Sequence, residues 1–463
     1  MNVGCGKADI TPELGLPMLG MPGSPRGNGV VWPLQSRVVL LDDGDERAAV
    51  VSLDLIALGP DVVALMRSEL SGRGGLPPER ILLACSHTHR APYTSPDPAL
   101  PGAEPEPVGS YLEMVLARTG KAMDAAVATL QPARLSVGRE RTTGWAFNRR
   151  PIYTGGQVGT HGWTWLDGFE RMEETPDEDV WILAARTPQG DPIGGLVGFA
   201  CHPTAMGHDP VYSADYPGVL TNQLEARHGG IFGFLLGAAG DTSTPDPASR
   251  DPESGFGVVH TERMGAALAD AADEALREAR PVVGDRLRVS RTRLPIAQRQ
   301  PTAEQLALAR WYLEARPADI DELDFTRRLY GYDYTFRDGV QVGNERHAQE
   351  MLRMLAWQQG PDARLIEEIE VTAMTIGDVA LVAFPAEMFT ALGRAVQAAS
   401  PFPDTFIVSL ANGWHGYVPT REAFTRGGYE PRFAFPSRLD EGAGVRLTAA
   451  AVSLLGELAA AER

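Results

Sequence analysis

The chain has 463 residues, of which 43% are hydrophobic and 22% are charged, as is usual for a globular protein. Its formal net charge of −18 at pH 7, without a basic stripe, argues against nucleic acid or an anionic membrane surface as a partner. The three cysteines (Cys5, Cys85 and Cys201) lack metal-motif spacing and leave one unpaired, which fits a reducing compartment. Because neither a signal-peptide pattern nor a long apolar run is found, we expect a cytoplasmic protein without a transmembrane segment.

The pattern of apolar residues and turns in the first part of the chain predicts strands and helices in alternation. A lead-in rich in Gly and Pro covers residues 1–35, and a hairpin follows around Asp43-Gly-Asp-Glu46. Ser110 and Glu113 have the spacing of a capping box and predict the start of a long helix. The segment from Thr142 to Asp179 has no clean period but several aromatic residues, so it is interpreted as the wall or lid of a pocket or, alternatively, as a packed loop.

A buried strand over residues 80–86 ends in His87-Thr88-His89. On an extended chain, residues two apart point to the same side, so both imidazoles would project together. Neutral imidazoles are zinc ligands, which makes the pair a candidate metal site. The alternative is a pair of loop histidines hydrogen-bonded to the backbone.

The second part of the chain continues the alternation. A strand at residues 286–294 has one basic face, and a hairpin is predicted over Gly377-Asp378. Pro385 is expected to open a helix at its first position. We predict an α/β fold with a mixed β-sheet core and flanking helices, in a single domain over residues 1–463 with a helical insertion at about 296–362.

Five apolar strands each end in a polar candidate. If these strands share one sheet with like orientation, the candidates meet at one rim. Two histidines and one glutamate form a catalytic zinc set that leaves a position for water. Each member also has an ordinary structural explanation, such as a backbone hydrogen bond for His202, the helix dipole for Glu387 or a plain turn for Asp241. The candidates are His87 and His89, His202, Asp241 and Ser243, Glu387, and Asn412 to Tyr417, with Asp54 as a further strand-end candidate.

Taken in order, these segments resemble the catalytic domain of the neutral ceramidase family. The resemblance spans nearly the whole chain, although each match is short. Arg149 lies in Phe147-Asn-Arg-Arg-Pro151, which looks like the Asn-Arg-Ser-Pro segment of the family. The other matching segments are Val3 to Pro12, Ser86-His-Thr-His-Arg-Ala-Pro92, Phe199-Ala-Cys-His-Pro-Thr-Ala-Met206, Gly240-Asp-Thr-Ser-Thr-Pro245, Phe384-Pro-Ala-Glu-Met-Phe-Thr390 and Ala411 to Thr420.

The resemblance implies one Zn²⁺ ion held by His87, His202, Glu387 and Tyr417. It further implies that His89 lies beside the metal water, and that Arg149 and Tyr429 stabilise the oxyanion formed when this water attacks an amide carbonyl. Ser243 matches the active-site serine of the family and could be a nucleophile or a positioning hydroxyl; the sequence shows no adjacent base, which favours positioning.

The expected activity is therefore zinc-dependent hydrolysis of an N-acyl amide, with a small-molecule or lipid-like substrate. Hydrolysis of an ester, lactone or peptide in the same site is the alternative, and a non-catalytic binding protein is a third hypothesis. Secreted members of the family carry a leader and a C-terminal immunoglobulin-like domain, and neither is expected here. The segment Asp241-Thr-Ser-Thr-Pro245 departs from the Asp-Val-Ser-Pro of the family, which suggests a substrate smaller than a long-chain sphingolipid.

Overall fold

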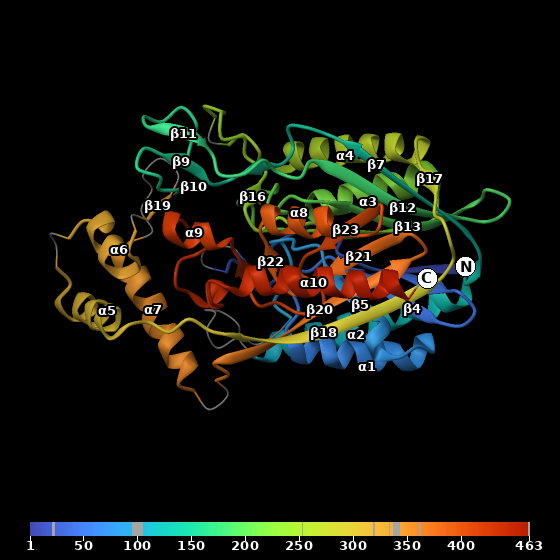
Figure 1. Cartoon of the computed structure of the whole chain (residues 1–463), viewed down its shortest axis with the longest axis horizontal. Helices are drawn as coiled ribbons and strands as arrows, with labels where there is room; N and C mark the ends of the chain where they lie inside the picture. The colour runs from blue at the N-terminus through green and yellow to red at the C-terminus, as the bar shows by residue number, and fades with distance from the viewer. Residues whose placement is uncertain are drawn as a thin grey trace.

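The computed structural model describes residues 1–20, 24–94, 105–251, 253–317, 320–332, 334–336, 343–360 and 363–461. Its strands form three larger sheets, each covered by helices, with α1 and α2 along the lower edge and α3 and α4 along the upper edge in the view of Figure 1. The predicted α/β fold with a mixed sheet core and flanking helices is confirmed.

The first sheet has the strand order β5-β4-β3-β1-β6. Its predicted hairpin is present, with β3 antiparallel to β4, and β5 runs parallel to β4. Helix α2 packs directly on β1. The two backbones lie so close that a Cβ atom at Gly4 or Gly6 would be 2.0 or 1.9 Å from a carbonyl oxygen of the helix. Helix α2 begins at Pro105, so Ser110 lies inside the helix and the predicted start was too late. The elements are β1 (Asn2–Asp9), β3 (Gln35–Asp42), β4 (Arg47–Leu53), α1 (Pro60–Gly74), η1 (Pro78–Arg80), β5 (Ile81–Cys85), α2 (Pro105–Ala128) and β6 (Gln131–Pro132).

The second sheet has the order β15-β13-β12-β7-β17 and is mixed. Strand β13 pairs antiparallel with β12 on one side and parallel with β15 on the other. Helices α3 and α4 pack against each other and against this sheet. The elements are β7 (Arg134–Arg141), β12 (Asp179–Arg186), β13 (Pro192–Phe199), α3 (Asp215–His228), β15 (Ile231–Leu236), α4 (Val258–Arg277) and β17 (Arg280–Pro281).

The third sheet has the order β18-β20-β21-β23 and is covered by α8 and α10. The hairpin predicted over Gly377 is present between β20 and β21, and Gly377 has a φ of +55° there. Helix α10 is the one helix of the described residues that is long and apolar enough to cross a bilayer. Its buried residues belong to the core beneath the sheet, and a core helix meets the same test. The elements are β18 (Leu287–Ala297), β20 (Ile366–Ile376), β21 (Val379–Ala383), α8 (Thr390–Ala399), β23 (Asp404–Val408) and α10 (Ala443–Ala460).

Three helices lie between β18 and β20 in the sequence and stand apart from the sheets at the left of Figure 1. We call α5 (Ala303–Ala315), α6 (Glu322–Tyr330) and α7 (Asn344–Gln358) the helical unit. Its apolar cluster includes Phe325 and Met351, and also Phe433, which belongs to the segment after α9 (Arg421–Arg426). The remaining elements are β2 (Val30–Trp32), β8 (Phe147–Asn148), β9 (Pro151–Tyr153), β10 (Gly159–Thr160), β11 (Phe169–Met172), β14 (Tyr212–Ser213), β16 (Thr242–Ser243), β19 (Thr335–Phe336), β22 (Glu387–Met388), β24 (Tyr417–Val418) and η3 (Phe435–Ser437).

The three sheets meet at a junction formed by residues 409–412, just beyond β23. Ser409 donates its N–H to the carbonyl of Leu236 at the end of β15, and Asn412 donates its N–H to Leu83 in β5. Leu410 and Asn412 both have positive φ values, which are uncommon for residues other than glycine. The carboxyl ends of the parallel pairs β4/β5, β13/β15 and β21/β23 are thereby brought together. The strand ends therefore converge although the five strands belong to three sheets and not to the one sheet on which the sequence argument was conditional.

Candidate metal centre

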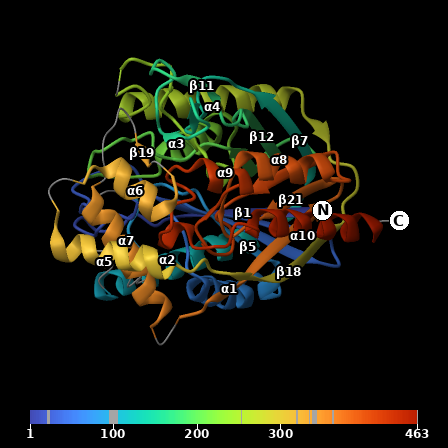
Figure 2. The same cartoon turned by 60° about the vertical axis from the view of Figure 1, so that its left-hand side comes forward.

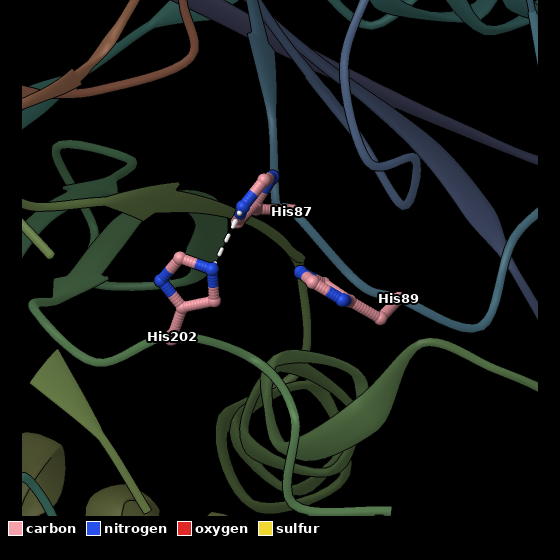
Figure 3. Close-up of side chains that lie close together, drawn as sticks. All are labelled: His87, His89 and His202. Atoms are coloured by element: carbon pink, nitrogen blue, oxygen red, sulfur yellow. Dashed lines mark hydrogen bonds between the residues drawn. The ribbon is translucent and has the colours of Figure 1, made fainter. Parts of the chain in front are cut away.

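His87 and His202 face each other across the junction. Their Nε2 atoms are 3.0 Å apart, and both side chains are buried (Figure 3). The Nδ1 atom of His87 lies 2.7 Å from the carbonyl oxygen of Ile56, and that of His202 lies 3.1 Å from the carbonyl oxygen of Ala239. A carbonyl only accepts, so each Nδ1 carries the proton and each Nε2 presents a lone pair. Two facing lone pairs repel unless a cation lies between them.

The backbone at His87 is not extended. Strand β5 ends at Cys85, and His87 has a φ of +68°, in the left-handed region. Strained conformations of this kind cost about 1–3 kcal/mol and cluster at functional sites. The ring of His89 nevertheless lies 5.0 Å from that of His87. The two imidazoles therefore converge, as predicted. They do so through a turn beyond the strand, whereas the prediction assumed the alternation of an extended chain.

His89 completes a group of three histidines. One ring nitrogen from each of them lies within 4.8 Å of the other two. The Nδ1 atom of His89 lies 3.0 Å from the carbonyl oxygen of Gly20, and its buried Nε2 atom has no hydrogen-bond partner among the residues that the structure describes. Gly20 has a φ of +88°, and a Cβ atom there would lie 2.6 Å from His89 Nδ1, so glycine is required at this position. Burial, with a smaller contribution from His87, lowers the pKa of His89 to about 3. The ring is thus neutral at physiological pH.

Glu387 supplies a carboxylate to the same place. Its Oε2 atom lies 3.3 Å from Nε2 of His87 and 3.7 Å from Nε2 of His202. Its Oε1 atom accepts a hydrogen bond of 2.9 Å from the indole N–H of Trp414, while Oε2 is buried and has no hydrogen-bond partner within the described part of the chain. Burial raises the pKa of Glu387, but His87 and hydrogen bonds from Trp414 and Tyr417 outweigh it, so the pKa is lowered and the carboxyl is ionised.

Tyr417 is the register partner of Glu387. The two residues pair in the parallel strands β22 and β24, which aligns their side chains. The helix predicted to begin at Pro385 begins instead at Thr390, so the placement of Glu387 in a first helical turn was wrong. The ring of Tyr417 stacks at 6.5 Å from that of His202.

This donor set fits a zinc ion. Two imidazole Nε2 atoms and one carboxylate oxygen converge in a buried space beside the ring of Tyr417, and the carbonyls of Ile56 and Ala239 fix the orientation of the imidazoles. Nitrogen and oxygen donors of this kind are those that zinc takes in catalytic sites. Among the described residues, His87, His89 and His202 could hold a metal ion, and the carboxylate of Glu387 faces two of these imidazoles.

Arg149 lies against the ring of Tyr417. Its guanidinium carbon is 5.5 Å from the centroid of the Tyr417 ring. Arg149 is held by Glu430 at 2.7 Å and by the carbonyl of Gly240 at 2.7 Å. Burial lowers its pKa, but Tyr417 and Glu430 more than offset this, so Arg149 stays charged. Tyr429 packs edge-on against Tyr417 with ring centroids 5.8 Å apart, which places both candidate oxyanion donors next to the same ligand.

Ser243 and Arg149 line one pocket. Strand β16 pairs with β8, which places Ser243 opposite Phe147 and beside the segment that carries Arg149. His161 and Trp163 line the same pocket, together with Asn148, Gly162, Pro245 and Pro247. Residues of the segment from Thr142 to Asp179 therefore line a small cavity beside Ser243. His161 has a φ of +55° and donates its N–H to the carbonyl of Arg149.

Asp241 and Asp54 have structural partners. Asp241 accepts hydrogen bonds from Asn148 and from the backbone and hydroxyl of Thr390, so it ties β8 to the start of α8. Asp54 pairs with the buried Arg37 at 3.2 Å and accepts from the N–H of Gln35, which explains its place without a role in the site. Of the polar residues in Asn412 to Tyr417, Tyr417 and Trp414 reach Glu387, whereas His415 pairs with Glu367.

We expect Asp241 to make the stability of the fold depend on pH. Burial raises its pKa to about 6, against 3.8 for the ordinary group, and the hydrogen bonds from Thr390 only partly oppose this. The folded state therefore binds the proton more tightly, and the stability due to Asp241 is lost as pH rises from 5 to 7, by about 1 kcal/mol. Denaturant unfolding of the wild type and of Asp241→Asn at both pH values measures it. The difference in unfolding free energy between the two proteins should change by this amount; a constant difference would contradict the assignment.

Several neighbours of the site were not predicted. Trp414 and Glu430 lie beside predicted residues in the sequence. Trp414, however, pairs with Glu387, 27 residues away, and Glu430 pairs with Arg149, 281 residues away. His161 lies in a loop with no motif around it, so the sequence carries no signal for its place beside Ser243. Gly20 could have been singled out only by its positive φ, which the sequence does not display.

No protein-family model matches the sequence. Among solved structures, the chain is similar to neutral ceramidase from Pseudomonas aeruginosa, with a TM-score of 0.70 and 21% identity over 98% of this chain and 74% of that one. A second structure, described as ceramidase complexed with C2, has a TM-score of 0.69 and 20% identity over 98% of this chain and 75% of that one. The protein therefore has an α/β fold of the neutral ceramidase type, as the sequence motifs predicted.

Proposed function

We propose that the protein is a zinc-dependent hydrolase of N-acyl amides. The observation that carries the proposal is the convergence of the Nε2 atoms of His87 and His202 on the unpartnered Oε2 atom of Glu387. The fold shared with two ceramidase structures supports an amide as the scissile group. A ceramidase acts on a lipid-like N-acyl compound, so we propose a substrate of that class.

Zinc in this site would supply a water activated near neutral pH and would polarise the carbonyl of the substrate. The other roles fall to residues of the chain. The Nε2 atom of His89 lies beside the ligands without a partner among the described residues. Because the pKa of His89 is low, we propose that the ring holds a proton only transiently while it relays the proton from the water to the leaving amine. Arg149 and Tyr429 flank Tyr417 and are placed to donate to the oxygen that becomes negatively charged. Ser243, in the pocket with Arg149, would orient the substrate.

The three described cysteines are buried and free, which is compatible with the cytoplasmic location that we propose.

The test of this function is acid release from a series of N-acyl amides, from acetyl to long-chain ceramide. We expect hydrolysis that a chelator abolishes and added zinc restores, because the proposed activated water depends on the ion. The chain-length optimum would identify the acyl group. Hydrolysis that survives complete removal of metal would contradict the mechanism. Cleavage of esters or lactones in place of every amide, still reversed by chelation, would change the substrate but keep the metal site.

A further inference from the structure

The segment that carries Tyr429 is held by the helical unit. We call residues 427–435 the Tyr429 loop. Phe433 of this loop is buried in the apolar cluster of α5, α6 and α7, and the ring of Phe435 packs edge-on against Trp357 of α7 at 5.1 Å. The hydroxyl of Tyr332, just beyond α6, donates to the carbonyl of Gly428 at 3.3 Å. Figure 2 shows α6 and α7 beside the chain that leads out of α9.

Arg432, in the same loop, lies against the face of Tyr429. Its guanidinium carbon is 4.1 Å from the centroid of the Tyr429 ring, and the arginine is 4% exposed. A cation over an aromatic face is attracted by the negative face of the ring, and more strongly where water is excluded. The same cation stabilises negative charge that develops on the phenol oxygen when its O–H donates a strong hydrogen bond. Tyr429 is therefore a stronger donor with Arg432 in place.

The helical unit supplies the partner that fixes Arg432. Glu350 of α7 accepts from Nε of Arg432 at 3.2 Å and from a terminal nitrogen at 3.4 Å. Both members of this pair are largely buried, at 5% and 13% side-chain exposure. A second cation, Arg346, binds Glu350 one helical turn away at 3.2 Å, but it is 52% exposed and belongs to the solvent side of the helix. Glu350 thus joins α7 to the loop through its buried pair with Arg432.

We propose that Arg432, oriented by Glu350 of the helical unit, is a positioning residue that strengthens Tyr429 as a hydrogen-bond donor to the substrate oxyanion. The inference rests on the proposed hydrolysis, in which Tyr429 is that donor. It assigns the helical unit a part in the reaction, although none of its residues reaches the metal ligands through the contacts described above.

The first measurement is steady-state hydrolysis by Arg432→Met and by the charge-balanced variant Glu350→Met/Arg432→Met. The double variant removes the buried pair together and so leaves no unpaired buried charge. Both should lower kcat about tenfold and leave KM within about twofold, since the interaction strengthens in the transition state. Arg432→Lys should recover part of the loss, because it keeps a cation over the ring. The matched control Arg346→Met, which removes the exposed cation bound to the same carboxylate, should change kcat less than about twofold.

The decisive comparison repeats these substitutions in a Tyr429→Phe background. If Arg432 acts through the phenol hydroxyl, Arg432→Met should change kcat less than about twofold there. Equal losses in both backgrounds, with normal melting temperature and zinc content, would overturn the proposal.

A second cycle separates the inference from the proposed function. Calorimetric binding of an alkylphosphonate, a tetrahedral anion, to the zinc-loaded protein needs no turnover. Arg432→Met should weaken this binding several-fold in the wild type but not in Tyr429→Phe. A wild type that cleaves no acyl compound but shows this coupling would refute the proposed hydrolysis only. Absence of coupling would refute the role of Arg432.

Discussion

Replacement of Glu387 by glutamine should remove the bound metal and the hydrolytic activity together. The amide keeps the size of the side chain and an oxygen that can accept from Trp414, but it removes the charge that faces His87 and His202. Loss of a group that only hydrogen-bonds to a metal ligand already costs about 10–100-fold in metal affinity or activity. Loss of a direct ligand should therefore weaken zinc binding at least about a hundredfold, and kcat/KM should fall by about a thousandfold or more.

The measurement is zinc content per chain after dialysis, together with hydrolysis of the best amide substrate. Glu368→Gln is the matched control, since Glu368 lies on β20 with its side chain exposed to solvent. It makes the same chemical change far from the ligands and should alter neither quantity. One zinc per chain retained by the Glu387→Gln protein would show that this carboxylate is not a ligand.

Arg149→Met should lower kcat by about 10²–10³-fold, which is the usual cost of losing one donor to an oxyanion. The effect should fall on kcat with little change in KM, because the proposed interaction forms only as charge develops on the substrate oxygen. The change leaves Glu430 paired with the buried Arg150, so no carboxylate is left without a cation. Zinc content should fall less than in Glu387→Gln, because Arg149 lies beside the proposed ligand Tyr417 but does not itself hold the ion.

Arg149→Lys tests whether charge alone is sufficient. The guanidinium of Arg149 donates to Glu430 and to the carbonyl of Gly240 through different nitrogens and lies against the ring of Tyr417, which a single ammonium group cannot reproduce. We expect this variant to recover no more than about a tenth of the lost rate. Stopped-flow or steady-state kinetics at saturating substrate measures it. An Arg149→Met enzyme with unchanged kcat but raised KM would make Arg149 a substrate-binding group instead.

The sequence predicted the elements of this fold better than their assembly. The hairpins around Asp43 and Gly377 and the strands before His87 and His202 follow from local patterns of apolar residues and turns. The division into three sheets depends on hydrogen bonds such as that from Ser409 to Leu236, which no local pattern encodes. Glu387 was placed on a helix because Pro385 has the position of a helix start, but pairing of β22 with β24 overrides that propensity.

The candidate site shows the same division. The histidines, Glu387, Tyr417, Arg149 and Tyr429 were singled out by strand ends and by resemblance, and the structure brings them together. What holds them was not predictable: the carbonyls of Ile56 and Ala239, the indole of Trp414 and the carboxylate of Glu430 come from distant segments. A backbone carbonyl has no sequence signature at all. Motifs therefore identify chemically active groups, while their support is visible only in three dimensions.

The junction at residues 409–412 has a consequence for how the protein folds. Its hydrogen bonds join the first sheet to segments more than 300 residues away and the second sheet to segments more than 150 residues away, so we expect it to form after the sheets themselves. Closing such long loops is entropically unfavourable and slow. The metal ligands, which span residues 87 to 417, then remain scattered until this last docking step. Zinc uptake would consequently report the final stage of folding, and a chain arrested before it would contain native sheets without any capacity to retain the ion.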